Sequence, residues 1–435
     1  MNDAQRYSPE RPQRVILGAM STPRPHIRME AVTETARVTP LELFFDLVFV
    51  FALTQITAFM AVELTAASVL RGLLVFAMLW WCWVGYAWLG NIVRADEGVG
   101  RVAMFGAMAA MFVLALSIPE AFTDLDGGLS GPVVFALGYL AVRVLHLTIL
   151  WLAAADDPGL RRQLLRFAPS VAGGTVLLLV ASQLEGSAQT LVWAAALLAD
   201  YVGTMLAGAS GWRVRSAKHF AERHGLILIV ALGESVVAIG VGVSARPISW
   251  PIVVAATLGL AVAAAIWWAY FDVVALVAER MLSRAEGEQQ ARLARDSYSY
   301  LHLPMIAGVV LLALGLKKVL EYVGDTAGHE LTDALGPVPA SALFGGVALY
   351  LLALVAFRYR NVRSLNVQRA AVAAVLLALM PVGTRIPALA ALGLLATVTT
   401  ALIAFEAVHF AAVRERVRHE GDAVVSVFTG SSRTE

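Results

Sequence analysis

Twelve apolar stretches, each about 17 to 25 residues long, occupy most of this 435-residue chain. Helices of that length cross the roughly 30 Å hydrocarbon core of a bilayer, where an open backbone finds no water to bond with. Hydrophobic residues make up 59% of the chain and charged residues 15%, which excludes a soluble globular domain. We therefore predict an all-α, polytopic membrane protein. The expected spans are residues 43–62, 68–90, 102–122, 132–154, 168–184, 188–209, 224–243, 251–277, 300–320, 339–357, 367–384 and 387–411.

The chain ends and the turns divide the sequence further. The N-terminal residues contain Arg, Pro and Glu but no apolar signal-peptide segment, so we expect a disordered arm there. Pro381, Gly383, Arg385 and Pro387 crowd the turn between the last two spans, which leaves open whether these are two full crossings or one hairpin. The expected organisation is an arm over 1–38, a first six-helix half over 39–209, a linker over 210–221, a second six-helix half over 222–418 and a disordered tail over 419–435.

The distribution of Lys and Arg predicts the orientation in the membrane. If the N-terminus is cytoplasmic, 27 of the 33 Lys and Arg residues lie on the cytoplasmic side, in agreement with the positive-inside rule. The predicted outer loop that holds Glu120, Asp124 and Asp126 contains no Lys or Arg. A missed helix in the middle would invert the bias of every later loop. The charges therefore favour an even number of spans with both termini, and the arm, linker and tail, in the cytoplasm.

A weak internal repeat relates the two predicted halves at an offset of 180 residues. Glu42 corresponds to Glu222, and the apolar run that ends at Thr54 corresponds to the run that ends at Glu234. Six helices per half is an even number, so the halves are expected to be parallel repeats; chance similarity among apolar helices is the alternative. Further correspondences pair Trp80 and Trp81 with Trp267 and Trp268, and Gly138 with Gly346.

The first span carries two carboxylates. In the string ELFFDLVFVFALTQ, residues 42–55, Glu42 and Asp46 share one helical face with Leu53 and, just beyond, Thr57. An ionised carboxylate near mid-bilayer costs about 2.5–3.5 kcal/mol even on the lenient insertion scale, so this face should meet protein and carry function. The alternative is an interfacial Asp46 that reaches the lipid headgroups.

Arg143 lies near the middle of the fourth span, on one helical face with Tyr139 and His146. Arginine does not lose its proton, so its guanidinium must find an anion or water within the membrane. One interpretation is an ion pair with Asp46, Asp200 or Glu234 that fixes the helices. The other is a charge gate or a counter-ion for a substrate.

Buried carboxylates outnumber cations in this prediction. Asp46, Asp200, Glu234 and Asp272 stand at membrane depth against Arg143 as the one obligate cation. The surplus of three negative charges requires protonation, bound cations or access to water, and we expect at least one of these carboxylates to be protonated. The remaining members of the candidate polar core are Glu222, His146 and His302, and a buried His is more often a satisfied hydrogen-bonding residue than a ligand.

Several chemistries have no support in the sequence. The single Cys82 excludes a disulfide framework and a thiolate zinc site. No His-Glu-x-x-His motif, no Ser with a paired base on its helix and no basic patch with aromatic residues is present. We therefore expect no enzymatic activity, no metal, no cofactor and no nucleic-acid partner. The expected partner is the lipid bilayer, and no pattern indicates an oligomeric state.

Three strings together resemble the bacterial low-temperature-requirement A family: ELFFDLVFVFALTQ at 42–55, HFAERHGLILIVALGESVVAIG at 219–240 and RDSYSYLHLPMIAGVVLLALGL at 295–316. The similarity extends from Val38 to about Arg418. The resemblance implies a multi-pass protein of the bacterial inner membrane with a cold-growth phenotype, and no established biochemical activity. The opening Phe44, Phe45 and Asp46 is also similar to the Phe-Ser-Asp signature of lysosomal-type potassium channels, with Phe45 in place of Ser.

Two classes of function follow from these expectations. The first is a transporter or channel in which the buried carboxylates and Arg143 handle protons, small cations or a small solute. The second is a non-transporting membrane component that supports growth in the cold, in which the polar core is purely structural. A membrane enzyme ranks third, because no nucleophile, base and oxyanion site occur at a known spacing.

The predicted orientation is testable with reporter fusions. A reporter placed after Asp126 should be periplasmic and one placed after Arg418 should be cytoplasmic, because the Lys and Arg bias places those points on opposite sides. Two fusions that report the same side would contradict the count of twelve spans.

Overall fold

The computed structural model describes residues 36–94, 96–244 and 246–419, and within these ranges it is helical with no β-strand. The predicted arm over 1–38 and tail over 419–435 lie almost entirely outside the described residues. The helices are α1 (Pro40–Glu63), α2 (Ala66–Ile92), α3 (Gly98–Leu116), η1 (Ile118–Glu120), α4 (Gly131–Ala153), α5 (Pro158–Ala181), α6 (Gly186–Ala207), α7 (Ala217–Gly242), α8 (Trp250–Phe271), α9 (Val274–Arg284), α10 (Gly287–Leu293), η2 (Ala294–Tyr300), α11 (His302–Gly324), α12 (Pro337–Ala340), η3 (Ser341–Gly345), α13 (Gly346–Val362), α14 (Val367–Gly383), α15 (Ala388–His409) and α16 (Ala411–His419).

Each of the twelve predicted spans coincides with one helix or with a chain of consecutive helices. Ten of these segments, among the described residues, are long and apolar enough to cross a membrane. The other two, α3 and α14, are shorter apolar helices. The last two predicted spans form two separate helices, α14 and α15, which pack on each other. The structure therefore supports ten crossings, and the count of twelve stays a prediction.

Local sequence explains where the central helices begin. Pro40 occupies the first turn of α1, and the Thr39 side chain accepts a hydrogen bond from the Glu42 amide while the Glu42 carboxylate accepts one from the Thr39 amide. This reciprocal pair satisfies two amides that a helix start leaves free. At α7 the Ser216 side chain accepts from the His219 amide in the same way. As a result α7 starts at Ala217, well before the predicted start at residue 224.

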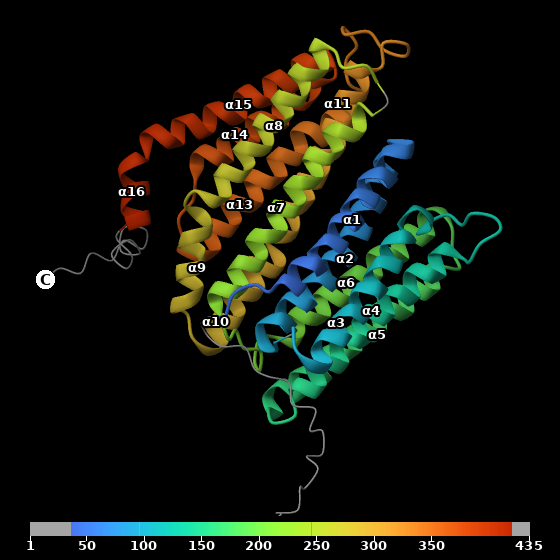
Figure 1. Cartoon of the computed structure of the whole chain (residues 1–435), viewed down its shortest axis with the longest axis vertical. Coiled ribbons are helices and arrows are strands. Elements are labelled where there is room, and N and C mark those ends of the chain that lie inside the picture. The colour runs from blue at the N-terminus through green and yellow to red at the C-terminus, as the bar shows by residue number, and fades with distance from the viewer. Residues whose placement is uncertain (1–35, 95, 245, 420–435) are drawn as a thin grey trace, which may run out of the picture.

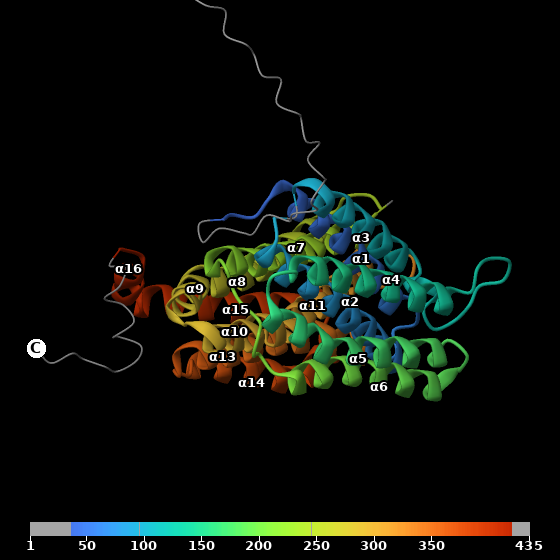
Figure 2. The same ribbon diagram turned by 90° about the horizontal axis from the view of Figure 1, so that it is seen from below.

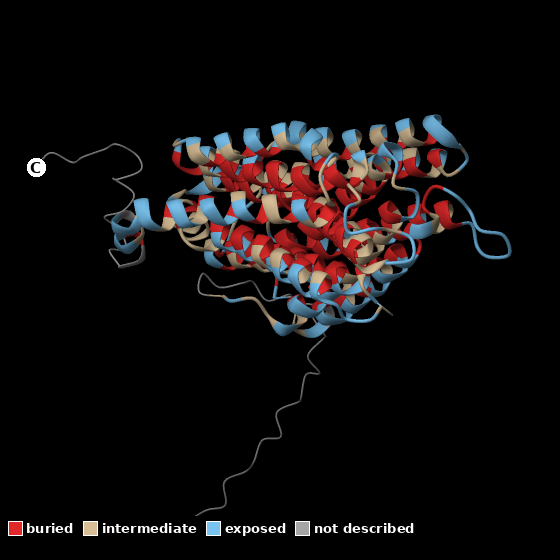
Figure 3. Ribbon diagram, turned by 90° about the horizontal axis from the view of Figure 1, so that it is seen from above, coloured by how far each residue is buried: buried red, intermediate tan, exposed pale blue. Residues whose placement is uncertain are grey.

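The helices run side by side, with α1 and α7 in contact at the middle of the molecule (Figure 1). Seen from below, α1, α3 and α7 lie on one side of the bundle and α5, α6 and α14 on the other, with α2 and α11 between them (Figure 2). Buried residues fill the interior and exposed residues cover the outside (Figure 3). Many exposed side chains are large and apolar, which suits a hydrocarbon surrounding. Examples are Leu43, Phe44 and Leu47 on α1 and Leu191, Leu198 and Leu206 on α6.

A wide helical turn, η2, stands at the start of the ninth predicted span. The Leu301 amide donates to the Asp296 carbonyl, five residues back. Pro304 contributes to this irregularity, because proline has no amide hydrogen to donate to the Tyr300 carbonyl and its ring displaces that carbonyl. The turn exposes backbone to other helices. The Trp80 indole donates to the Ser299 carbonyl at 2.8 Å, and Trp88 donates to the Ser299 hydroxyl at 3.0 Å.

Two glycines let α11 and α13 approach closely. A Cβ atom at Gly308 would lie 2.5 Å from the Gly346 carbonyl oxygen and 2.8 Å from the Tyr350 amide nitrogen. A Cβ atom at Gly346 would lie 2.7 Å from the Gly308 carbonyl oxygen. Small residues at such positions allow the backbone contact that holds membrane helices together.

We expect Gly308→Ala to lower the free energy of unfolding by about 1–3 kcal/mol, because the new methyl group overpacks a backbone contact. The matched control is Gly233→Ala, since a Cβ atom there meets nothing within 4 Å. The measurement is the thermal unfolding midpoint of each variant in detergent. Equal midpoints for the two variants would show that the contact between α11 and α13 is not tight.

Candidate functional site

Polar side chains line the contact between α1 and α7, and we call this contact the α1–α7 seam. A Glu42 carboxylate oxygen lies 3.1 Å from His219 Nε2, and Arg223 Nη2 donates to Asp46 Oδ1 at 3.0 Å. Further along, the Thr54 hydroxyl donates to Glu234 Oε2 at 2.5 Å. The partners' numbers rise together along both helices, so α1 and α7 run parallel. Glu42, Asp46, His219, Arg223 and Glu234 are each at most 2% exposed.

Helix α2 completes the end of the seam that holds Glu42 and Asp46, and we call this the inner end. Trp83 Nε1 donates to Asp46 Oδ1 at 2.8 Å, so this oxygen accepts from both an indole and a guanidinium. Arg223 also lies 3.4 Å from Glu42 Oε1 and over the Trp83 ring, 5.6 Å from its centroid. Gly90 makes room for the Glu42 carboxylate, since a Cβ atom there would lie 2.3 Å from Glu42 Oε1. Three helices therefore enclose one carboxylate pair.

The hydrogen bonds of Asn91 determine the tautomer of His219. Asn91 Oδ1 accepts from the Arg215 amide at 2.8 Å, and Asn91 Nδ2 donates to the Ser216 carbonyl at 2.7 Å. The same Nδ2 group lies 3.3 Å from His219 Nδ1, which must then be an acceptor. His219 is therefore neutral in this arrangement and donates its Nε2 hydrogen to Glu42.

The charges at the inner end of the seam do not cancel. Glu42 and Asp46 face Arg223 as the one charged cation, because His219 is neutral. Asp46 Oδ2 is buried and has no hydrogen-bond partner among the described residues. One carboxylate of this pair therefore needs a proton or a bound cation.

The predicted surplus of three buried negative charges is wrong. Arg223 pairs with Asp46, and Arg414 pairs with Asp272 at 2.6 Å. Both arginines escaped the prediction because they lie at helix ends that the apolar windows left out, Arg223 in the second turn of α7 and Arg414 in α16. Fewer carboxylates than predicted therefore lack a cation. Those that remain are on the seam, where Glu42 and Asp46 share Arg223 and Glu234 has no Lys or Arg partner among the described residues.

Glu234 is the more isolated of these carboxylates. It lies near the middle of α7, is 1% exposed, and forms no ion pair with any Lys or Arg of the described residues. The Thr54 hydroxyl donates to it and also lies 3.3 Å from the Val50 carbonyl, and the Thr57 hydroxyl is a second neutral neighbour. A charged carboxylate that meets neutral hydroxyl groups and no cation is costly in a bilayer, whereas a protonated one is not.

Arg143 forms a second buried centre. Its Nη2 atom lies 3.0 Å from Asp200 Oδ1, which confirms the predicted pairing with a carboxylate of another helix. The Tyr139 hydroxyl donates to the other Asp200 oxygen, and the Arg143 guanidinium lies over the Phe167 ring, 5.0 Å from its centroid. Each of the three polar side chains is at most 1% exposed. The Asp200 carboxylate is thus matched in charge and in hydrogen bonds.

A small cavity of about 40 Å³ adjoins Arg143 and is lined by His146, Trp81, Trp88, Trp212 and Arg295, among others. His146 shares the helical face of Arg143, as predicted, and neither of its ring nitrogens has a hydrogen-bond partner among the described residues. Gly85 gives the ring room, because a Cβ atom there would lie 3.1 Å from it. A cavity of this size holds a few water molecules, which are natural partners for the imidazole.

The other predicted site residues have simpler environments. His302 is satisfied: its Nδ1 donates to the Ser297 carbonyl at 3.2 Å and its Nε2 accepts from the Tyr270 hydroxyl at 3.0 Å. The Thr57 hydroxyl donates to the Leu53 carbonyl at 3.0 Å. Asp272 ends α8 near the surface. Glu222 is only half-buried, and its Oε2 atom has no hydrogen-bond partner among the described residues.

His219 and Arg223 are the seam residues that the sequence reasoning missed. A signal for them exists in the spacing of polar residues. His219, Arg223, Val230 and Glu234 repeat the spacing of Glu42, Asp46, Leu53 and Thr57, so both helices carry the same one-sided pattern. The offset between these two patterns is 177 residues, whereas the predicted repeat pairs Glu42 with Glu222.

No group of three or more His, Cys, Asp or Glu side chains, among residues 36–94, 96–244 and 246–419, is placed to hold a metal ion. The chemistry that the described polar residues support is the binding of protons and of small ions by carboxylates and guanidinium groups.

Comparisons with known proteins agree with one another. A family model described as bacterial low temperature requirement A protein (LtrA) matches residues 37–404. An uncharacterized protein of Rhizobium meliloti (strain 1021) is 26% identical over 337 residues, which cover 74% of this chain and 79% of that protein. No solved structure matches the chain.

We expect Arg143→Met to lower the free energy of unfolding by about 3–5 kcal/mol, because it leaves the Asp200 carboxylate buried and unpaired. The double variant Arg143→Met with Asp200→Leu should recover most of this loss. The measurement is thermal unfolding in detergent. The control is Arg292→Met, which breaks an exposed pair with Glu288 and should have little effect. A single variant as stable as the wild type would contradict a structural role for the pair.

Proposed function

The chain belongs to the bacterial low temperature requirement A family, and we propose that it is a proton-linked transporter or channel whose working surface is the α1–α7 seam. The transported species is a proton, or a small cation or solute whose movement is coupled to one. The observation that carries the proposal is the unmatched negative charge along the seam. Its two locations are the Glu42 and Asp46 pair at one end and Glu234 further along.

Buried carboxylates without a matching cation are costly when they serve only to pack helices. Binding of a proton or cation removes the free-energy cost of the buried charge, and release of that ion restores the cost. A transport site needs such reversible binding. Arg223 lowers the cost at the inner end by contacting both carboxylates. Glu234 lacks that help and is the strongest proton-binding candidate on the seam.

A path along the seam requires some movement of the helices. Eight residues separate Asp46 from Thr54, a distance of about 12 Å along a helix, which is too far for direct proton transfer. Water that enters the seam, or a change in the packing of α1 against α7, can connect the two locations. The seam is suited to such a change because it joins two parallel helices that belong to different halves of the chain.

Orientation and repeat form part of the same proposal. We place the protein in the bacterial inner membrane with both termini in the cytoplasm, on the Lys and Arg bias. The 19 residues of α3 and the 17 residues of α14 extend about 28 and 25 Å, close to the core thickness, so we count both as crossings.

Parallel six-helix halves agree with the direction of α1 and α7. Trp267 and Trp268 are exposed, however, while Trp80 and Trp81 are buried, so this tryptophan correspondence is one of sequence only.

A second candidate function is a non-transporting component that supports growth in the cold. The observation that favours it is the presence of fully matched pairs. Arg143 with Asp200 is one, and Arg369 with Glu406 is another, with two hydrogen bonds of 2.8 and 2.7 Å between the guanidinium and the carboxylate. Such pairs fix helix positions, and a protein made only of them would need no ion to move.

The test is proton flux in liposomes that contain the purified protein and a pH-sensitive dye. An imposed membrane potential should drive acidification with the wild type. Glu234→Gln and Asp46→Asn should each reduce the rate towards that of empty liposomes, because an amide does not bind and release a proton at these positions.

Glu288→Gln is the matched control, because Glu288 is exposed on α10 and lies away from the seam. It should keep the wild-type rate, and all variants should be folded in the membrane. A wild type that moves no ion or solute in a broad screen, but restores growth in the cold with both seam carboxylates neutralised, would rule out transport and support the structural function.

A further inference from the structure

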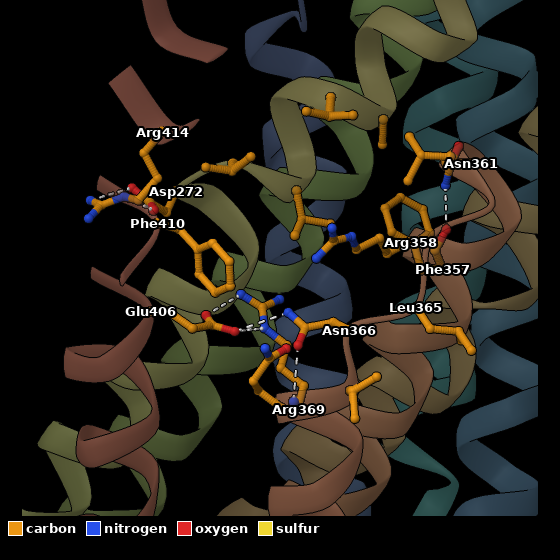
Figure 4. A pocket seen from close by; sticks show the side chains of 17 residues that line it. Asp272, Phe357, Arg358, Asn361, Leu365, Asn366, Arg369, Glu406, Phe410 and Arg414 are labelled. Atoms are coloured by element: carbon orange, nitrogen blue, oxygen red, sulfur yellow. Dashed lines mark hydrogen bonds and ion pairs between the residues drawn. The ribbon is translucent and has the colours of Figure 1, made fainter. Parts of the chain in front are cut away.

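Two cavities bounded by the described residues differ in how their polar groups are paired. The larger, with a volume of about 370 Å³, lies where the junction of α8 and α9 meets the end of α13 and the start of α14. Its carboxylates are already paired, Glu406 with Arg369 at 2.7 Å and Asp272 with Arg414 at 2.6 Å (Figure 4). The smaller, of about 40 Å³, lies beside Arg143, and we call it the Arg143 cavity.

The Arg143 cavity lies on the far side of α2 from the α1–α7 seam. Trp83 of α2 donates to Asp46 on the seam, whereas Trp81, on the opposite face of the same helix, lines the cavity. Helices α4, α5 and α6 and the turn η2 supply most of the other walls. The cavity is therefore enclosed by both halves of the chain and is separate from the seam carboxylates.

Hydrogen-bond donors outnumber acceptors around the Arg143 cavity. Arg143 Nε, Trp81 Nε1 and both ring nitrogens of His146 are buried and form no hydrogen bond with the described residues. The three side chains are 1%, 3% and 2% exposed, and all of them line the cavity. The guanidinium and indole nitrogens only donate, while a neutral imidazole, here packed on the Gly85 backbone, adds one donor and one acceptor.

The charges around the cavity favour an anion over a cation. Two guanidinium groups line it, and no Asp or Glu of the described residues does. Arg143 is balanced by Asp200, which lies outside the lining. Arg295 and Arg360 share the Asp296 carboxylate, at 2.8 and 2.9 Å, so one positive charge of this group has no carboxylate of its own.

Water fits the Arg143 cavity by size but matches its chemistry poorly. Each water molecule brings two hydrogens that need acceptors, and the unpartnered atoms here are mostly donors. Ser299 adds a further donor, because its oxygen already accepts from Trp88 at 3.0 Å. A halide ion accepts from several donors at once and donates to none. The volume of about 40 Å³ suits such a monatomic ion with little water around it.

The walls of the cavity strengthen the attraction for an ion, and one side gives access to it. Rings surround much of the space, and few groups compete with the donors, so the local dielectric is low. Arg295 and Trp212 are only half-buried. Trp212 belongs to the linker over 210–221, so an ion enters from that side. The aromatic residues of the lining are Trp81, Trp88, Phe167 and Trp212.

We propose that the Arg143 cavity binds a monovalent inorganic anion of the size of chloride, held by Arg143 Nε, Trp81 Nε1 and an N–H group of His146. Arg295 supplies the positive charge that the ion balances. The bound ion stabilises the contact of η2 with α2 and α4. The inference goes beyond the transport proposal and does not depend on ion movement along the seam.

The test is the thermal unfolding midpoint of the purified full-length protein in detergent, with sodium gluconate replaced stepwise by sodium chloride at constant ionic strength. Chloride should raise the midpoint in a saturable manner, because it binds the folded state and gluconate is too large for the cavity. Trp81→Phe removes one donor and keeps an aromatic ring. It should weaken chloride binding about tenfold, because a hydrogen bond to a charged group is lost.

Trp193→Phe is the matched control. Trp193 is 2% exposed, as deeply buried as Trp81, but it does not line the cavity, so the variant should keep the chloride dependence of the wild type. Equal midpoints of the wild type in chloride and in gluconate would overturn the proposal. The same chloride dependence in Trp81→Phe and Trp193→Phe would overturn it as well.

A direct measurement covers the case in which Trp81→Phe does not fold. Crystals of the wild type grown in sodium bromide should show an anomalous-scattering peak inside the cavity, beside Arg143 and Trp81. A cavity that holds water only, with no such peak, would contradict the proposed anion site.

Discussion

Every charge placed in a bilayer must be matched, and this requirement organises the protein. Where the match is complete, as between Arg143 and Asp200, the pair fixes one helix against another and excludes alternative packing. Where it is incomplete, as at Glu234, we propose that the helix contact depends on a proton or ion that binds and leaves. The same physical cost therefore produces both the rigid parts of the bundle and the part that we propose to be active. The active part lies between α1 and α7, which belong to different halves of the chain.

The inner end of the seam also shows how neutral residues control a charged group. Asn91 has no charge, but its amide fixes the hydrogen of His219 on the nitrogen that faces Glu42. Gly90 has a comparable effect through size, since any side chain there would displace the Glu42 carboxylate. Both residues lie on α2, the helix that holds the carboxylate pair from behind.

Apolar length and one-sided polar spacing were enough to predict the helices and the inward-facing position of Asp46. They also predicted that Arg143 meets a carboxylate, because an unpaired guanidinium in hydrocarbon has a high free-energy cost. They failed for Arg223, because polar residues in the first turns of α7 lower the local hydropathy although the folded bundle buries them. The choice of Asp200 as the partner of Arg143 depends on packing between segments far apart in the chain. Hydropathy contains no information on such contacts.

The wide turn at η2 has a mechanical consequence. Trp80 and Trp88 of α2 both form hydrogen bonds with Ser299, so that point would stay fixed if α11 tilted against α2. Helix α11 would then rotate about Ser299. Because α11 is about 35 Å long, a tilt of about 10° would move its far end by about 6 Å. Gly242 packs against the Lys317 carbonyl near that end, which makes α7 follow α11. Such a tilt would widen the seam at Glu234 while Glu42 and Asp46 stay closed.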